Sequence, residues 1–434
     1  MSWSQVNLTE MLEARDRRVE IQQRMLDKWG SPLLCLTMNI PGPVKRTPAI
    51  RWLFEVGRQR ILQWNFSLLE EYVSDNTTGC EVCYALKAEA EAVKEKAVAL
   101  EDAFPAARLY DLDVLNSRGQ KLSRASQRRC LVCEKPAAEC ARSRAHGLDN
   151  VLSVVHGLLG DFVAAQLAEE AHAALLGELY TTPKPGLVDR ANNGAHSDMS
   201  LALFERSAAA LHDYFLSVAQ LGWQDSSMSE MRALGQQAEE RMFVATGGVN
   251  THKGMVYSMG LLLWGMARTL CCGGTAVERA AELARADAEA RLAEAWRNPQ
   301  THGARAFRQH GARGALGEAA AGFPHARQAA ELIGRYRALQ VDGPEALALN
   351  DLMAELEDTN LLHRGGPEGL EFVRTEARAI AQLPYAERLA ALVRLDTACI
   401  ARHLSPGGSA DMLALGLLLR TWEDLQPVLR GSDM

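Results

Sequence analysis

The chain of 434 residues has no excess of positive charge, because 54 acidic residues outnumber 47 lysines and arginines to give a net charge of −7. A nucleic-acid surface needs a basic face, so this balance argues against a nucleic-acid partner. The sequence starts without a basic segment followed by an apolar run. Its longest apolar run, VYSMGLLLWGMA, is shorter than the roughly 20 residues that span a bilayer. We therefore expect a soluble cytoplasmic protein with no membrane partner.

The sequence also lacks a secretion signal, although it contains nine cysteines. Cysteines in such a chain are reduced thiols or metal ligands more often than parts of a disulfide framework. The length is too great for one ordinary core, so we expect two domains.

The first half alternates helical and strand patterns. Helices are expected over residues 8–26, 51–62 and 88–103, and strands over residues 33–40, 66–73 and 80–86. Asn7, with Glu10 three residues on, forms a capping-box pattern ahead of the first helix. The alternation predicts an N-terminal α/β (α+β) domain.

The segment RLYDLDVLN, residues 108–116, carries the acidic pair of this half. Side chains two apart on a strand share a face, so Asp111 and Asp113 point together. Such a pair suits Mg²⁺ in phosphoryl or nucleotidyl transfer, with Arg118, Lys121 and Arg124 following in a turn. A solvent-facing acidic strand is the alternative.

Four sulfur and imidazole ligands follow with the spacing C-x2-C-x6-C-x5-H, at Cys130, Cys133, Cys140 and His146. Three thiolates and one imidazole can complete a tetrahedral zinc site. A cluster of reduced, partly buried thiols is the alternative.

Together, LTMNIPGPVKRTPAIRWLFEVG, RLYDLDVLNSRGQKLSR and RRCLVCEKPAAECARSRAH resemble the apo-citrate lyase phosphoribosyl-dephospho-CoA transferase family over residues 8–155. The resemblance implies that a serine of the apo acyl carrier (gamma) subunit of citrate lyase attacks triphosphoribosyl-dephospho-CoA, and that pyrophosphate leaves. It assigns Asp111 and Asp113 to a metal, and Lys45, Arg108 and Arg124 to phosphate. The family's His-Pro-Leu-Gly-Arg stands here as Phe104 to Arg108. An inactive N-terminal domain that only docks the carrier is therefore an alternative.

The second half begins with an unbroken helical pattern over residues 148–180, so no flexible linker marks the junction. We place the junction near residues 157–160, with domains of residues 1–157 and 158–434. Helical patterns with short polar breaks follow, without a convincing strand, which predicts an all-α domain.

The polar stretch TTPKPGLVDRANNGAHSDM, residues 181–199, separates two of these helices. Its prolines hold Lys184 on a stiff segment, and Asp189, His196 and Asp198 follow at a density that suits a metal-bound polyphosphate. The alternative is a simple helix entry capped by Ser197 or Asp198.

Four further polar blocks lie at expected helix ends. Each one alone also fits a capped helix terminus, but a helical domain can gather them into one pocket. Their candidate residues are Asn250, His252 and Lys253; Arg313 and Glu318; Asp358, Asn360 and Arg364; and Asp411.

The blocks TPKPGLVD, NNGAHSDM, GVNTHKG, DTN with RGG, and SPGGSAD resemble the triphosphoribosyl-dephospho-CoA synthase family over residues 165–425. The implied reaction joins ATP to 3'-dephospho-CoA with loss of adenine, and it asks for Mg²⁺, a base, an acid and cations on the triphosphate. The expected roles are metal ligand or base for Asp189, Asp198 and Asp358; triphosphate contact for Lys184, Lys253 and Arg364; and acid for His196 or His252.

One block departs from this family. Its Gly-Ala-Arg-Gly-Glu-Ala stands here with Leu316 at the arginine position, so Arg313 either substitutes for that arginine or the contact is weakened.

Joined in one chain, the two halves predict a bifunctional transferase that builds and attaches the citrate lyase prosthetic group. A metal-dependent nucleotide hydrolase is the alternative reached without the resemblances, and a carrier from malonate decarboxylase is an alternative partner.

Overall fold

The computed structural model describes residues 3–431 and separates into two compact units. Within the described residues the first comprises residues 3–163, 270–272 and 425–431, and the second comprises residues 164–269 and 273–424. The division between Val163 and Ala164 lies inside one continuous helix, α5 (Leu148–Tyr180), as the unbroken helical pattern indicated.

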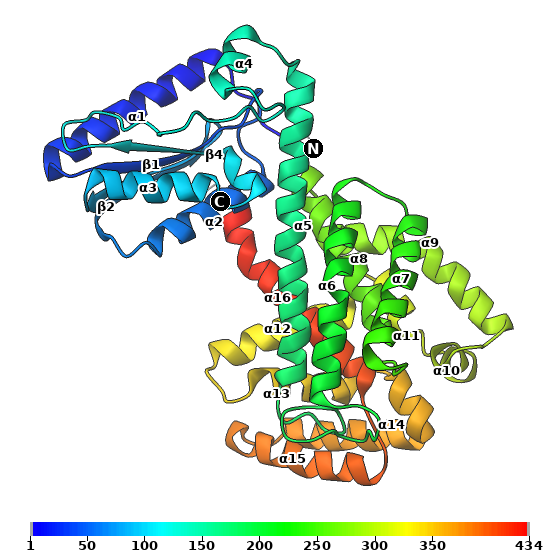
Figure 1. Ribbon diagram of the computed structural model, residues 1–434. Helices are drawn as coiled ribbons and strands as arrows, with labels where there is room; N and C mark the ends of the chain where they lie inside the picture. Colours follow the sequence, from blue (N-terminus) through cyan, green and yellow to red (C-terminus); the bar gives the residue numbers. More distant parts are fainter. Residues whose placement is uncertain (1–2, 432–434) are drawn as a thin grey trace. The chain divides into compact units, whose positions relative to one another are not determined.

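The first unit contains a four-stranded sheet in the order β2-β3-β1-β4 (Figure 1). Every neighbouring pair is antiparallel, which makes the domain α+β, with no parallel βαβ crossover. β2 continues further than the expected residue 73, because a tight turn at Thr77 and Thr78 joins it directly to β3. The strands are β1 (Leu33–Met38), β2 (Ser67–Asn76), β3 (Gly79–Lys87) and β4 (Tyr110–Leu115).

The helices of the first unit cover both faces of this sheet. They are α1 (Leu8–Trp29), α2 (Pro48–Leu62), α3 (Ala90–Glu101), the short 3₁₀ helix η1 (Pro105–Leu109) and α4 (Ala137–Ser143), together with the start of α5. The expected capping box of α1 is formed: the Asn7 side chain accepts from the amide of Glu10 at 3.0 Å, and the Glu10 carboxylate accepts from the amide of Asn7 at 2.7 Å.

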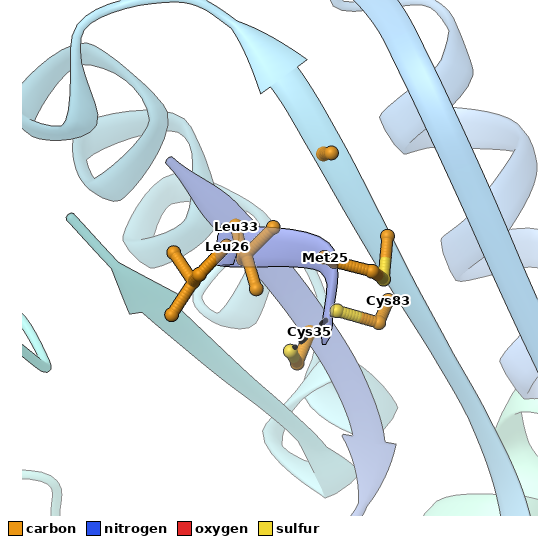
Figure 2. Packing of buried hydrophobic residues seen from close by; sticks show 6 residues of the cluster. Met25, Leu26, Leu33, Cys35 and Cys83 are labelled. Atoms are coloured by element: carbon orange, nitrogen blue, oxygen red, sulfur yellow. Dashed lines mark hydrogen bonds between the residues drawn. The ribbon is translucent and has the colours of Figure 1, made fainter. Parts of the chain in front are cut away.

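One face of the sheet packs against α1 through a small core of Met25, Leu26, Leu33, Cys35, Cys83 and Ala85 (Figure 2). The register pairs Cys35 with Asp113 and Thr37 with Asp111. Directly paired residues of an antiparallel ladder share a face, so both aspartates lie on the side of the sheet that α1 partly covers. The buried Tyr110 lies on the opposite face, as the alternation predicted.

The second unit, as far as the structure describes it, contains helices and no strand, in agreement with the expected all-α architecture. Its long buried helices, such as α8, contribute large apolar side chains to the core. After the end of α5 its helices are α6 (Leu201–Trp223), α7 (Met228–Thr246), α8 (Lys253–Cys272), α9 (Ala276–Arg297), α10 (His302–His310), α11 (Gly314–Ala320), α12 (Pro324–Ala338), α13 (Pro344–Glu355), α14 (Thr359–Ala381), α15 (Tyr385–Ala401) and α16 (Gly407–Arg430). The last residues of α8 and of α16, from 270 and from 425 on, belong to the first unit.

Two helices, α5 and α8, are long and apolar enough to cross a membrane by length and composition alone. For α8 this differs from the expectation, because the helix extends beyond the apolar run to 20 residues. The most apolar windows of α5 and α8 are 44% and 72% buried in the structure, and a core helix of a soluble protein passes the same test.

Candidate active sites

A cavity of about 1270 Å³ lies within the second unit. Its walls come from the end of α5, the loop of residues 181–199, the start of α8, the region of α10 to α12, and the starts of α14 and α16. Every candidate residue of this unit except Asp189 and Asp198 lines the cavity. Segments more than 200 residues apart therefore contribute to one polar site, as the pocket hypothesis required.

Lys184 is buried at 2% exposure and its Nζ donates to Glu178 Oε1 at 2.5 Å. Glu178 stands two residues before the end of α5 and also lines the cavity. A buried ion pair of this kind is costly to break, because either partner alone would leave an unpaired charge in the interior. Lys184 is thus aimed into the site by the stiff loop, but its charge is already neutralised by Glu178.

Asp189 and Asp198 are the two candidate residues of this unit that do not line the cavity. The carboxylate of Asp189 accepts hydrogen bonds from the backbone amides of Lys184, Ala191 and Asn192 at 2.7 to 3.1 Å, so both of its oxygens fix the loop. Asp198 is exposed. The alternative of a helix entry capped by Ser197 or Asp198 is wrong about the capping residue, because the N-cap of α6 is Ser200.

His196 joins the loop to two other segments. Its Nε2 lies 2.9 Å from Ser405 Oγ, and its Nδ1 accepts from Arg364 Nη2 at 3.1 Å. Burial and the neighbouring Arg364 guanidinium lower the pKa of His196. The imidazole is therefore held neutral at neutral pH, with both ring nitrogens engaged.

His252, the residue before α8, is fully enclosed, and its Nδ1 lies 2.7 Å from Ser207 Oγ. Burial, followed by the Lys184 charge, lowers the pKa of His252 to about 4. Lys253 is half exposed and pairs with Glu239 at 2.8 Å, and the Asn250 side chain accepts from the Lys253 amide at 3.3 Å.

Asp358 connects the N-termini of two helices. One carboxylate oxygen accepts from the amides of Asn360 and Leu361 at the start of α14, and the other accepts from the amide and hydroxyl of Ser409 at the start of α16. The residue is 1% exposed, and burial raises its pKa despite these donors. The glycines at the start of α16 permit this approach, since a Cβ at Gly408 would lie 3.1 Å from the carboxylate.

Asp411 lies one turn into α16 and opens onto the cavity. Among residues 3–431 no group donates a hydrogen bond to its carboxyl. Burial, with the nearby carboxylates of Glu178 and Asp358, raises the pKa of Asp411 to about 8. A Cβ at Gly254 would lie 2.7 Å from Asp411 Oδ2, so the start of α8 packs tightly on this carboxyl.

The α11 region contributes a second carboxylate and a cation. Glu318 is buried and binds the Nδ1 of His325, and this hydrogen bond raises the pKa of His325. Arg313 is exposed to the cavity and forms no ion pair within the described chain. Leu316 lines the same cavity one turn later, so a cation is present near the position where the family pattern has one.

The first unit presents Asp111 and Asp113 on β4, with side chains 49% and 33% exposed. Lys121 Nζ lies 2.5 Å from Asp113, and Arg128 lies 3.6 Å from Asp111. Two carboxylates and two cations are therefore adjacent at β4. This arrangement favours the metal hypothesis over the alternative of a solvent-facing acidic strand.

The predicted phosphate cations of this unit are dispersed. Lys45 donates to the carbonyl of Ile40, and Arg124 pairs with Glu101 at 3.0 Å and Asp102 at 2.6 Å. Arg108 donates to the carbonyl of Cys130 at 2.7 Å. Arg124 lies near β4 because it pairs with Glu101, whose carboxylate accepts from the amide of Leu112 on that strand. Arg108, whose side chain binds the Cys130 segment, lies near β4 as well, and its carbonyl accepts from Arg128.

The residues that stand before β4 in place of the family's His-Pro-Leu-Gly-Arg have a structural role in this chain. Phe104 packs against Tyr110 and Phe162, and the Arg60 guanidinium lies over its ring at 4.7 Å. Ala107 is completely buried. Phe104 thus packs a phenyl ring against aromatic core residues at the position where the family has an imidazole.

Three site residues were missed from the sequence: Glu178, His325 and Arg128. Glu178 was detectable as an acidic residue in the last turn of a mostly apolar helix, where a negative charge is unfavourable without a partner. Arg128 stands in the basic run RASQRR. His325 carries no comparable signal, because its role depends on contact with Glu318.

These features define a two-site enzyme, with one site on an α+β unit and one in a helical cavity. Residues 164–428 match the family model described as ATP:dephospho-CoA triphosphoribosyl transferase, and residues 6–162 match that of apo-citrate lyase phosphoribosyl-dephospho-CoA transferase. The chain belongs to both families, in one polypeptide, and is a transferase of citrate lyase prosthetic-group synthesis.

Two relatives of similar length and one shorter relative support this organisation. Protein CitXG of Haemophilus influenzae is 36% identical over 444 residues, covering 95% of each chain. Protein CitXG of Leuconostoc mesenteroides subsp. cremoris is 30% identical over 454 residues, covering 95% of this chain and 97% of the relative. The 2-(5''-triphosphoribosyl)-3'-dephosphocoenzyme-A synthase of Haemophilus ducreyi is 38% identical over 315 residues, covering 65% of this chain and 97% of the relative.

Proposed function

We propose that this enzyme catalyses two consecutive steps, synthesis of the prosthetic-group precursor in residues 158–434 and its attachment in residues 1–157. In the first step the ribose 2'-hydroxyl of 3'-dephospho-CoA attacks the anomeric carbon of ATP. A carbon–oxygen bond forms, the bond to adenine breaks, and the triphosphate remains on the product. The observation that carries this proposal is the cavity that gathers polar residues from every predicted polar block of the second unit.

Asp411 is the proposed base for the incoming hydroxyl. A carboxyl to which no group of residues 3–431 donates a hydrogen bond, with a pKa of about 8, is a far stronger base than an ordinary aspartate and still ionises near neutral pH. Asp358 is less suited, because four donors already occupy its oxygens. Asp358 instead holds the starts of α14 and α16 in place around the cavity.

His325 is the proposed acid that protonates departing adenine, in preference to His196 or His252. Glu318 raises the pKa of His325, whereas burial lowers the pKa of both other histidines. Only a histidine that carries its proton at neutral pH can deliver it to a leaving group.

Among the exposed cations that line the cavity, Lys253, Arg313 and Arg364 come from the predicted polar blocks and are available to the triphosphate. Guanidinium groups bind phosphate oxygens in bidentate geometry, and Arg313 has no competing carboxylate among the described residues. Lys184 fixes Glu178 in the cavity wall.

Mg²⁺ fits both sites by donor chemistry. In the second unit the carboxylate of Glu178, which lines the cavity, would hold it beside the triphosphate and leave Asp411 free to act as the base. In the first unit Asp111 and Asp113 would hold it. Mg²⁺ supplies charge neutralisation to the phosphate oxygens when bound.

In the second step a serine hydroxyl of the apo carrier attacks the phosphate nearest the ribose. A phosphorus–oxygen bond to serine forms, and the bond to pyrophosphate breaks. Lys121 and Arg128, beside the two aspartates, would orient the phosphates and neutralise the charge that develops on them. The partner is the acyl carrier (gamma) subunit of citrate lyase. We place both steps in the cytoplasm, where ATP and reduced thiols are available.

The test is chromatography of products formed from ATP, Mg²⁺ and 3'-dephospho-CoA, without and with apo carrier. We expect adenine release that depends on dephospho-CoA, then pyrophosphate and a mass gain on the carrier. His325→Gln should slow adenine release about 100-fold, the range typical of a lost general acid. ADP or AMP without adenine would indicate a nucleotide hydrolase.

Adenine release without carrier modification would leave the first unit as a docking module. Parallel reactions with apo carriers of citrate lyase and of malonate decarboxylase would decide the partner, since only the cognate carrier should gain mass.

A further inference from the structure

The segment between Asn116 and Asn150, described throughout, has almost no hydrophobic anchor. Its only buried residues are Cys130 and Cys140. The seven-residue helix α4 buries Cys140 and no other side chain. A stretch of this length with so little apolar burial needs another source of order, such as a cross-link or a metal.

The thiol and imidazole groups of this segment converge on one point. The ligand atoms of Cys130, Cys133, Cys140 and His146 all lie within 4.8 Å of one another. Cys133 Sγ lies 3.6 Å from Cys140 Sγ, and His146 Nε2 lies 3.3 Å from Cys133 Sγ. Zn²⁺ bonds of about 2.3 Å to sulfur and 2.0 Å to nitrogen, in a tetrahedron, separate sulfur atoms by about 3.8 Å and sulfur from nitrogen by about 3.5 Å.

The backbone has the form of a metal knuckle. The amide of Val132 points at Cys130 Sγ at 3.4 Å, and the amide of Cys130 donates to the carbonyl of Lys135 at 2.8 Å. A disulfide between Cys133 and Cys140 would use two sulfur ligands and leave the convergence of the third thiol and His146 without a cause. A metal accounts for all four.

We propose that Cys130, Cys133, Cys140 and His146 bind one structural Zn²⁺ that fixes Arg128 beside Asp111. Binding converts three thiols to thiolates, so up to three protons are released and the site carries a net charge of −1. The metal closes the segment that begins two residues after Arg128.

Arg128 is tied to this segment by its backbone and to β4 by its side chain. Its carbonyl accepts from the amide of Ala137, the first residue of α4, at 2.8 Å. Its guanidinium donates to the carbonyl of Arg108 at 2.9 Å and to that of Tyr110. Arg108 in turn donates to the carbonyl of Cys130. Zinc loss would free the segment and move Arg128 from its place beside Asp111.

Zinc binding stands independently of the proposed function, whereas the positioning of Arg128 for transfer rests on it. The experiment measures both on the purified full-length chain. Metal content is determined by elemental mass spectrometry for the wild type, for a Cys133→Ser/Cys140→Ser variant, and for Cys80→Ser as the control. Cys80 is a buried thiol of the same unit outside the cluster.

We expect about one Zn²⁺ per chain in the wild type and in Cys80→Ser, and a loss of at least tenfold in the double variant. Co²⁺ substitution should give the intense tetrahedral thiolate spectrum in the wild type and in Cys80→Ser, but not in the double variant. Wild-type protein that retains no zinc after dialysis from excess zinc, or a double variant that retains wild-type zinc, would overturn the site.

The positioning role is read from the two activities. The double variant should lose carrier transfer at least tenfold while adenine release stays at the wild-type rate, which also shows that the second unit is folded. Arg128→Ala should keep its zinc and raise the KM for the transfer substrate, with partial rescue by Arg128→Lys. If the double variant, which lacks zinc, transfers at the wild-type rate, the proposed positioning of Arg128 is refuted. The proposal that the wild type binds zinc is not affected by that result. Wild-type protein that releases no adenine would instead refute the proposed function.

Discussion

At the scale of single residues, Asp411 is a carboxyl whose environment strongly disfavours its charge. Its folded-state pKa of about 8 lies above the ordinary 3.8, so the folded protein holds a proton that the unfolded chain releases. The contribution of this residue to the free energy of unfolding is therefore present below about pH 4 and is lost as the pH rises to about 8.

We predict that Asp411→Asn slows adenine release by about 100-fold or more, because it removes the base. The same change should raise the melting temperature relative to wild type, by an amount that grows between about pH 5 and pH 8. Thermal unfolding across this range and steady-state adenine release provide the measurements. A melting-temperature gain that is independent of pH would show that Asp411 is ionised in the folded protein.

Arg313 offers a second residue-scale prediction. Arg313→Ala should raise the KM for ATP about tenfold or more with a small effect on kcat, since a ground-state phosphate contact is lost. Leu316→Arg in the same chain should recover ATP binding, because residue 316 lines the same cavity. Arg308→Ala is the matched control, an exposed cation of α10 outside the cavity wall. Equal KM values for the Arg308 and Arg313 variants would contradict this assignment.

The residue types of the site could be predicted, but their individual roles could not. Asp189 stands in the densest polar stretch of the chain, yet its oxygens are occupied by amides of its own loop. Which backbone donors reach a carboxylate depends on loop geometry that spacing does not encode. The pairing of His325 with Glu318 is invisible for the same reason.

At the scale of elements, the second site depends on how helices begin. Asp358 caps α14 with one oxygen and binds Ser409 at the start of α16 with the other. A single carboxylate thus fixes two helix ends that both border the cavity.

Asp358→Ala should therefore reduce the free energy of unfolding by about 2 to 4 kcal/mol, because it removes a helix cap and leaves buried amides without acceptors. Ser200→Ala, which removes the cap of α6 alone, should cost about 1 kcal/mol. Urea unfolding followed by circular dichroism compares the two. A cost for Asp358→Ala no greater than that of Ser200→Ala would exclude the double-cap role.

Elements were predictable where local chemistry decides them. The capping box of α1, the strand alternation at Asp111 and Asp113, and the unbroken α5 all follow from neighbouring residues. The antiparallel order of the sheet was not predictable, because it is set by pairings between strands such as β1 and β4 that are far apart in the chain.

At the scale of the whole molecule, two chemical sites occupy one chain and share no residue. The cavity residues lie between Leu175 and Ala414, whereas the carboxylate pair and the cysteine cluster lie before α5. The family resemblances identified both halves, but the cavity itself required the tertiary arrangement of helices from α5 to α16.

The central claim is that each unit performs its own transfer step. It is tested most directly by intact-protein mass spectrometry of the apo carrier, together with adenine chromatography, for two variants of the full chain. Asp111→Asn/Asp113→Asn should release adenine at the wild-type rate and leave the carrier unmodified. Asp411→Asn should release almost no adenine but modify the carrier when purified triphosphoribosyl-dephospho-CoA is supplied. Asp16→Asn, an exposed acid on α1, is the control. Carrier modification by the Asp111/Asp113 variant at the wild-type rate would contradict the account.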